Sequence, residues 1–153
     1  MTDERDFPSI LQDAARQLGL TVPDADEFGV CSVGLDDGFY LSIICPPFSE
    51  FAFLATPISI LDHLDRKSLY RRALESNYML SATRGATLAI DPQANQLLVC
   101  SRLRLESLTA DVLGEEISAI VAGARNLRET LLAEPVAGDP GKPGDAPHNY
   151  ITA

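Results

Sequence analysis

Three cysteines and two histidines are the side chains best suited to nucleophilic or metal chemistry, and they are widely spaced: Cys31, Cys45, Cys100, His63 and His148. A catalytic thiolate needs a base held against it. His63 falls in a loop that leads into a predicted helix, and His148 falls in a Pro/Gly-rich tail, so neither is a promising base. An odd number of cysteines without a C-x-x-C pair argues against a disulfide framework and a zinc site. We expect reduced, mostly buried thiols, no metal site and no cofactor.

Adjacent carboxylates are the other candidates for chemistry, and they occur at Asp36-Asp37 and Glu115-Glu116. Neighbours in sequence point apart on a strand or a helix, so these pairs are better explained as turn and helix-cap residues than as an acid/base dyad. The sequence has no H-E-x-x-H, no G-x-S-x-G and no Gly-rich phosphate loop after a strand. Thr83-Arg84-Gly85 is a turn before a strand. We therefore predict that the protein is not an enzyme.

Length and composition predict one globular domain, because the chain has 153 residues, of which 46% are hydrophobic and 22% charged. No apolar run approaches the ~20 residues that a bilayer span needs, and the N-terminus is acidic where a signal peptide would be basic. We expect a cytoplasmic protein without membrane insertion. The net charge of −10, from 22 acidic and 12 basic residues, opposes binding to nucleic acid or anionic lipid.

The negative charge is concentrated in the first half of the chain. Residues 1–65 hold 12 acidic and two basic residues, whereas residues 66–153 hold ten of each. This concentration either keeps a sticky surface soluble or recruits a basic partner, and ordinary solubility charge is the alternative.

A β-hairpin is predicted over Thr83–Leu105, where apolar and polar side chains alternate on both arms. Between the arms, Pro92 suits the second position of a turn and Asn95 tolerates positive φ. The connection is too long for a two-residue turn, so we expect four or five residues around a type I turn. This hairpin is expected to act as scaffold.

Three amphipathic helices are predicted, over Asp6–Leu18, from Asp62 or Asp65 to about Leu80, and over about Thr109–Ala133. In the second helix the apolar residues are expected to share one side: Leu69, Tyr70, Ala73, Leu74 and Tyr78. Basic residues dominate the rest of that helix. We interpret them as a solvated or intersubunit face rather than an RNA site.

Three strands are predicted at Glu27–Val33, Phe39–Cys45 and Glu50–Thr56, and the short loops between them indicate an antiparallel meander. An antiparallel sheet with one wet face should alternate apolar and polar residues. The second and third strands are instead apolar on both faces. Helices can cover one face, so the other must be covered by more of this chain, a second copy or a client polypeptide.

The predicted fold class is therefore α+β: an antiparallel sheet, made of a three-strand meander plus a C-terminal hairpin, with three helices in the order αβββαββα. Residues 1–134 form this domain. Residues 135–153 are rich in proline and glycine and are expected to be a disordered tail.

Two hairpin segments, Gly85–Asp91 and Leu97–Leu103, together with the closing helix through Leu131, resemble the class I type III secretion chaperones, the Tir chaperone family. The resemblance covers residues 5–133. Arg104 departs from it, because a proline is usual there in the family.

The resemblance implies a non-enzymatic homodimer that binds the N-terminal region of one or a few secreted effectors and keeps it extended for export without ATP. The dimer interface that it implies comprises Leu69, Tyr70, Ala73, Leu74, Leu88 and Ile90. The effector-binding residues that it implies are Leu11, Leu18, Phe28, Val30, Leu41, Ile43, Phe51 and Phe53. Alternation indicates which strand residues share a face, but not which face binds the client.

Two other functions remain open on the sequence. The first is a regulatory adaptor that binds a folded partner within a secretion system. The second is an enzyme of unknown chemistry, which would require a pocket with convergent polar groups.

Overall fold

The computed structural model describes residues 6–62, 65–80 and 83–133. The elements follow the predicted order αβββαββα, with two short 3-10 helices in addition: α1 (Phe7–Leu18), β1 (Val30–Gly34), β2 (Tyr40–Ile44), β3 (Phe51–Ile60), α2 (Arg66–Asn77), η1 (Tyr78–Leu80), β4 (Thr87–Asp91), β5 (Gln96–Arg104), η2 (Leu105–Ser107) and α3 (Ala110–Leu132). The predicted fold class is confirmed. The predicted tail lies outside the described residues.

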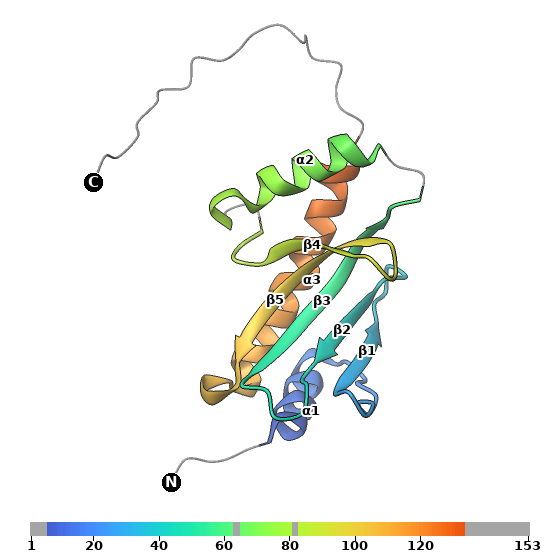
Figure 1. The fold of residues 1–153 in the computed structure, drawn as a ribbon. Helices are drawn as coiled ribbons and strands as arrows, with labels where there is room; N and C mark the ends of the chain where they lie inside the picture. Colours follow the sequence, from blue (N-terminus) through green and yellow to red (C-terminus); the bar gives the residue numbers. More distant parts are fainter. Residues whose placement is uncertain (1–5, 63–64, 81–82, 134–153) are drawn as a thin grey trace, which may run out of the picture.

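The meander and the hairpin form one antiparallel sheet of five strands in the order β1-β2-β3-β5-β4 (Figure 1). The hairpin joins the meander through β5, which pairs with β3 from Phe51↔Arg104 to Ile60↔Gln96. The loop between β4 and β5 has four residues, 92–95, and the Asp91 carboxylate accepts hydrogen bonds from two of its amides, those of Gln93 and Ala94. Strands β1 and β4 are consequently the two sheet edges.

Two helices cover one face of this sheet, and a side chain caps the start of each. Asp6 accepts a hydrogen bond from the Ser9 amide at the start of α1, and Thr109 accepts one from the Val112 amide at the start of α3. In Figure 1, α1 and α3 lie behind the sheet, whereas α2 crosses the C-terminal end of α3 beside β4.

The core lies between the sheet and helices α1 and α3. The strands contribute the buried side chains of Cys31, Val33, Leu41, Ile43, Ala52, Leu54, Leu88, Leu97, Val99 and Leu103. The helices contribute Ile10, Leu11, Ala14, Leu113, Ile117, Ile120, Ala124, Leu127 and Leu131. The helical stripes predicted from residue spacing therefore pack on one face of the sheet and leave its other face uncovered by the described helices.

Strand β3 is longer than predicted, because it continues through Pro57 to Ile60. Pairing of β3 with β2 ends at Ala55, and the register with β5 shifts between Pro57 and Ser59. The missing N–H of Pro57 therefore falls where β2 no longer pairs, at an irregularity where proline is tolerated. The prediction that this strand ends at Thr56, before Pro57, was wrong for this reason.

Candidate functional site

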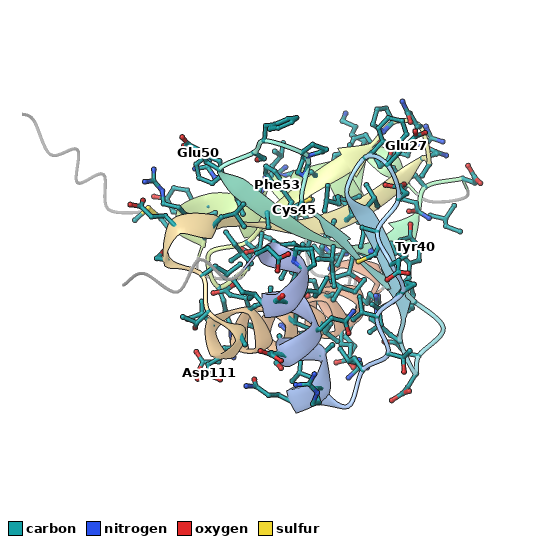
Figure 2. The ribbon with its side chains drawn as sticks, turned by 90° about the horizontal axis from the view of Figure 1, so that it is seen from below. Glu27, Tyr40, Cys45, Glu50, Phe53 and Asp111 are labelled. Atoms are coloured by element: carbon teal, nitrogen blue, oxygen red, sulfur yellow. The ribbon has the colours of Figure 1, made fainter. Side chains whose placement is uncertain are left out.

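The open face of the sheet carries a row of large apolar side chains across three strands. Val30 of β1 pairs with Ile44 of β2, and Ile44 pairs with Phe53 of β3, so the three lie side by side on one face. The row ends at Arg102 of β5, which pairs with Phe53. Figure 2 shows α1 and α3 on one side of the sheet, with Phe53, Glu27 and Glu50 on the other. The apolar face expected to need a partner therefore exists.

Two arginines of β5 partly cover the end of this face next to Phe51. The Arg102 guanidinium carbon lies 4.7 Å from the centroid of the Phe51 ring, and that of Arg104 lies 5.7 Å from it. Such stacking places each cation on the negative face of the ring. Phe51 is therefore held in place, while Phe53 and Ile44 are not covered in this way.

The strand residues predicted to bind effector do not share one face. Phe51, Phe53 and Val30 are partly exposed on the open face, but Leu41 and Ile43 point the other way, into the core, with exposed fractions of 0% and 1%. The prediction placed Leu41 and Ile43 in one surface with Phe53. The register corrects this, because it pairs Ile43 with the buried Leu54.

The remaining predicted effector-binding residues lie on the helical side or in the loop before β1. Leu11 is buried, Leu18 is partly buried against the core, and Phe28 projects into solvent.

A groove of about 340 Å³ lies between α1, the loop that follows it, and the neighbouring ends of β1 and β2. It is lined mainly by apolar groups: Phe7, Pro8, Leu11, Gln12, Pro23, Asp24, Ala25, Gly29, Cys31, Ile43 and Cys45. Two predicted effector-binding residues that are absent from the open face, Leu11 and Ile43, thus line this groove. Its volume falls within the range of ligand pockets, at roughly 300–1,000 Å³.

Asp26 shapes the loop beside the groove. Its carboxylate accepts hydrogen bonds of 2.9 Å from the amides of Phe28 and Val30, and its own amide donates to the Val30 carbonyl. Gly29 follows with a φ of +77°, and a Cβ there would lie 1.9 Å from the Cys45 carbonyl oxygen. Only glycine permits this close approach of β1 to β2.

The three cysteines are suited to packing rather than to chemistry. Burial raises the pKa of Cys31, and the charge of Asp26 raises it further. Burial also raises the pKa values of Cys45 and Cys100. Because the thiolate is the reactive form, these shifts keep the three free cysteines unreactive near neutral pH.

On each edge of the sheet, hydrogen bonds to a residue outside the strand occupy the outward backbone groups of one strand residue. On β1, the Cys45 amide donates to the Gly29 carbonyl and the Leu35 amide donates to the Phe39 carbonyl, so every second residue hydrogen-bonds to β2. The backbone N–H and C=O groups of residues 30, 32 and 34 therefore point away from β2. Asp26 hydrogen-bonds to both the N–H and the C=O of Val30. The outward N–H and C=O groups of Ser32 and Gly34 are left to pair with an added strand. On β4, the Asn77 side chain occupies both backbone groups of Leu88.

A second apolar patch, which we call the α2 patch, lies at the other end of the molecule. Leu74, Tyr78 and Met79 have exposed fractions of 71%, 76% and 78%, and Leu80 and Ile90 are also exposed. Monomeric proteins rarely expose such a contiguous group of large apolar side chains without a partner.

The residues predicted for the dimer interface divide between this patch and the core. Leu74 and Ile90 are exposed, Tyr70 is partly buried, and Leu69, Ala73 and Leu88 are buried within the single chain. The prediction that the apolar residues of α2 all share one side was wrong. Because α2 lies at the margin of the molecule, it buries the Leu69–Ala73 stripe and turns the adjacent Leu74–Tyr78 stripe outward.

Some exposed apolar residues were missed from the sequence. Phe48 is fully exposed with a φ of +62° in the Pro46–Ser49 turn, and Met79 and Leu80 have φ values of +58° and +54°. None of these three lies in a strand or an α-helix, so periodicity gave no signal for them. The aromatic residue directly after two prolines was the only available hint of an exposed Phe48.

The described segments contain no helix that is long and apolar enough to cross a membrane. Over residues 6–62, 65–80 and 83–133, no three His, Cys, Asp or Glu side chains are arranged to hold a metal ion.

This α+β domain has one apolar sheet face open, a groove beside the β1 edge and an exposed helical patch, which are surfaces suited to binding other polypeptides. Residues 9–128 match the Tir chaperone protein (CesT) family, and the chain belongs to this family. This membership places the chain among the chaperones, in the family that the sequence resemblance indicated. The comparison with curated proteins found no match.

Solved structures of low sequence identity share the fold. The HopA1-SchA chaperone-effector complex has a chain with 23% identity and a TM-score of 0.63, covering 80% of this chain and 93% of that chain. The ExsC-ExsE complex has one with 17% identity and a TM-score of 0.70, covering 83% and 97%. The Yersinia pestis type III secretion chaperone SycH, in complex with a stable fragment of YscM2, has 22% identity and a TM-score of 0.56, covering 80% and 99%.

Proposed function

We propose that this chaperone binds the N-terminal region of a secreted effector in extended form, and keeps it competent for export in the cytoplasm without catalysis. The observation that carries this proposal is the row of Val30, Ile44 and Phe53 on an open sheet face in a chain of the Tir chaperone family. Without a partner, this row would leave a continuous apolar surface in water.

An extended client suits this surface better than a folded one. The groove is lined by Cys31 and Ile43, which point to the helical side, whereas Val30 and Ile44 are on the open side of the same two strands. The two sites therefore lie on opposite faces of the sheet, joined around the β1 edge. An extended segment can pass around this edge and pair with the free backbone of Ser32 and Gly34, whereas a compact domain cannot occupy both faces.

The proposed functional unit is a homodimer in which a second copy covers the α2 patch. Leu74, Tyr78, Met79 and Ile90 supply the exposed apolar contacts for a two-fold interface of roughly 1,600 Å² in total. The α2 patch lies beside β4, at the opposite edge of the sheet from β1. Dimerisation through it leaves the groove and the β1 edge free for the client.

The test is co-purification with the secreted protein encoded nearest to the gene of this chaperone, followed by hydrogen exchange on the complex. The client should be protected over a few tens of residues near its N-terminus, and the chaperone over β1, β2 and the groove. Phe53→Asp should weaken binding about tenfold or more, because it places a charge in an apolar contact. Val112→Asp, at an exposed apolar position on α3, is the matched control and should bind normally.

Calorimetry on the same complex should give a strongly negative heat-capacity change with an opposing entropy, since apolar area is buried while the client becomes ordered. A bound partner that keeps a compact fold, with protection on the chaperone restricted to α2, would contradict the proposal. That result would identify the protein as a regulatory adaptor instead.

A further inference from the structure

The groove between α1 and the start of β1 has a negative rim over an apolar floor. Its floor is formed by Leu11, Ile43 and Cys31, and the charged residue among its lining groups is Asp24. None of the residues that line it is a lysine or an arginine. A segment bound in the groove is therefore close to the Asp24 carboxylate, and no lining residue offers it a positive charge.

Two further acids follow Asp24 in the same loop and strengthen the negative potential. Asp26 is held by its hydrogen bonds to Phe28 and Val30, and its charge is close enough to raise the pKa of Cys31 on the groove floor, in addition to the effect of burial. Glu27 is exposed, on the open side of the sheet beside the β1 edge (Figure 2). The negative charge thus extends from the groove around the edge that the client is proposed to cross.

The basic residues that could neutralise this region lie elsewhere or are already paired. Between α1 and the end of β3, the described chain has one base, Arg16, and its guanidinium is 2.8 Å from the Asp13 carboxylate. Arg125 and Arg128 of α3 both pair with Asp37, in the turn at the other end of β1. The charge around the groove is therefore left for a partner to balance.

We infer that the client segment bound in this groove carries a lysine or arginine next to the apolar side chain that fills it. This inference rests on the proposed function and specifies the chemistry of the client. The apolar side chain is buried against Leu11 and Ile43, and the flanking cation lies at the rim beside Asp24, in the loop that also carries Glu27. A flanking acid at the same position is repelled, so the groove selects among apolar segments by their charge.

The experiment uses the full chain and three dye-labelled peptides of equal length with one apolar centre, flanked by lysine, serine or glutamate. Fluorescence anisotropy measures the affinity of each peptide at low and high salt. The lysine peptide should bind up to about fivefold more tightly than the serine peptide at low salt, since an exposed charge pair contributes at most about 1 kcal/mol. The glutamate peptide should bind most weakly, and all differences should shrink as salt rises.

Variants of the chain show whether the groove causes this preference. Asp24→Asn combined with Glu27→Gln should reduce the difference between the lysine and serine peptides to less than about twofold. Glu115→Gln combined with Glu129→Gln changes the net charge equally on exposed positions of α3, and should leave the difference intact. Gln12→Lys, which adds a cation to the groove wall, should favour the glutamate peptide.

Each contrary result has a distinct meaning. Equal affinities for the three peptides would overturn the inference about charge and leave the proposed function standing. Failure of every peptide to bind would overturn the inference, because the groove would then not be a client site, while the Phe53→Asp experiment would still test the proposed function on the open face. A change in oligomeric state caused by Gln12→Lys would show that a second copy occupies the groove. Tighter binding of all three peptides after deletion of residues 134–153 would show that the chain's own C-terminal segment occupies the groove.

Discussion

Asn77 of α2 pairs with Leu88 of edge strand β4 as a neighbouring strand would. Its Nδ2 donates to the Leu88 carbonyl at 3.1 Å, and its Oδ1 accepts from the Leu88 amide at 2.8 Å. One side chain thus satisfies both outward backbone groups of Leu88 and ties α2 to the sheet. Because an unpaired strand edge can recruit another chain, this pairing also protects β4 from unwanted strand addition.

Asn77→Ala should destabilise the protein by about 2 kcal/mol, because two partly buried backbone groups lose their partners. Urea denaturation measures the loss, and light scattering on the folded variant should show a greater tendency to associate. Asn126→Ala, on the exposed side of α3, is the control and should remain within about 0.5 kcal/mol of the parent. A stable Asn77→Ala variant with unchanged association would remove this role of Asn77.

Leu74→Glu should convert the proposed dimer to a folded monomer. Leu74 is 71% exposed in the single chain, so the new carboxylate is hydrated in the monomer and unpaired in the interface. Light scattering after size-exclusion chromatography gives the mass, and circular dichroism verifies the fold. Leu88→Glu should instead unfold the chain, because Leu88 is buried in the core. A Leu74→Glu variant that stayed fully dimeric would show that the α2 patch is not the interface.

Arg72 of α2 stabilises the C-terminal end of α3. Its guanidinium donates to the Leu131 carbonyl at 2.8 Å, to the Ala133 carbonyl at 3.1 Å and to the Thr130 carbonyl, all of which are near the negative end of the helix dipole.

Arg72→Ala should therefore lower the unfolding free energy by about 2 kcal/mol, as expected for hydrogen bonds to a charged donor. Arg71→Ala is a suitable comparison, since Arg71 is exposed and pairs with Glu75 on the same helix, so its loss should have a much smaller effect. Arg72→Lys should restore little of the lost stability, because a single ammonium cannot reproduce the planar fork that reaches several carbonyls. Thermal melts of the three variants provide the ranking.

Asp37 gives the protein an acid-sensitive contact between the β1–β2 turn and α3. Burial opposes its ionisation, but the hydrogen bond from Arg125, the Phe39 amide and the charge of Arg128 outweigh burial and lower the pKa of Asp37 below 3.8, its ordinary value. A carboxyl group whose pKa is lower in the folded state stabilises the fold above its unfolded pKa. That stabilisation is lost as pH falls through the folded value.

Asp37→Asn should therefore be less stable than the parent at neutral pH, and the gap should narrow as the pH falls below about 4. Urea midpoints at several pH values measure it. Asp36→Asn, at the exposed neighbouring position, should track the parent across the range. A constant gap between Asp37→Asn and the parent down to pH 2 would mean that Asp37 acts through packing rather than charge.

The sequence was sufficient for the secondary structure and its order, because those depend on periodicity and local capping. Asp6 and Thr109 begin their helices as their residue types require, and Asp91 and Asn95 shape the turn between β4 and β5 as expected. The doubly apolar strands likewise predicted a sheet face in need of a partner. These properties depend on residues that are close in sequence.

Only the tertiary structure decided which side of each element is available. Alternation placed Leu41 with Ile43 and Phe51 with Phe53, but the side that α1 and α3 cover depends on long-range packing, which buries the first pair and leaves the second open. The same packing divided α2 into a buried Leu69–Ala73 stripe and an exposed Leu74–Tyr78 stripe. It also brought Asn77 to Leu88 and Arg72 to the end of α3. Such contacts join residues far apart in sequence, so no local pattern could predict them.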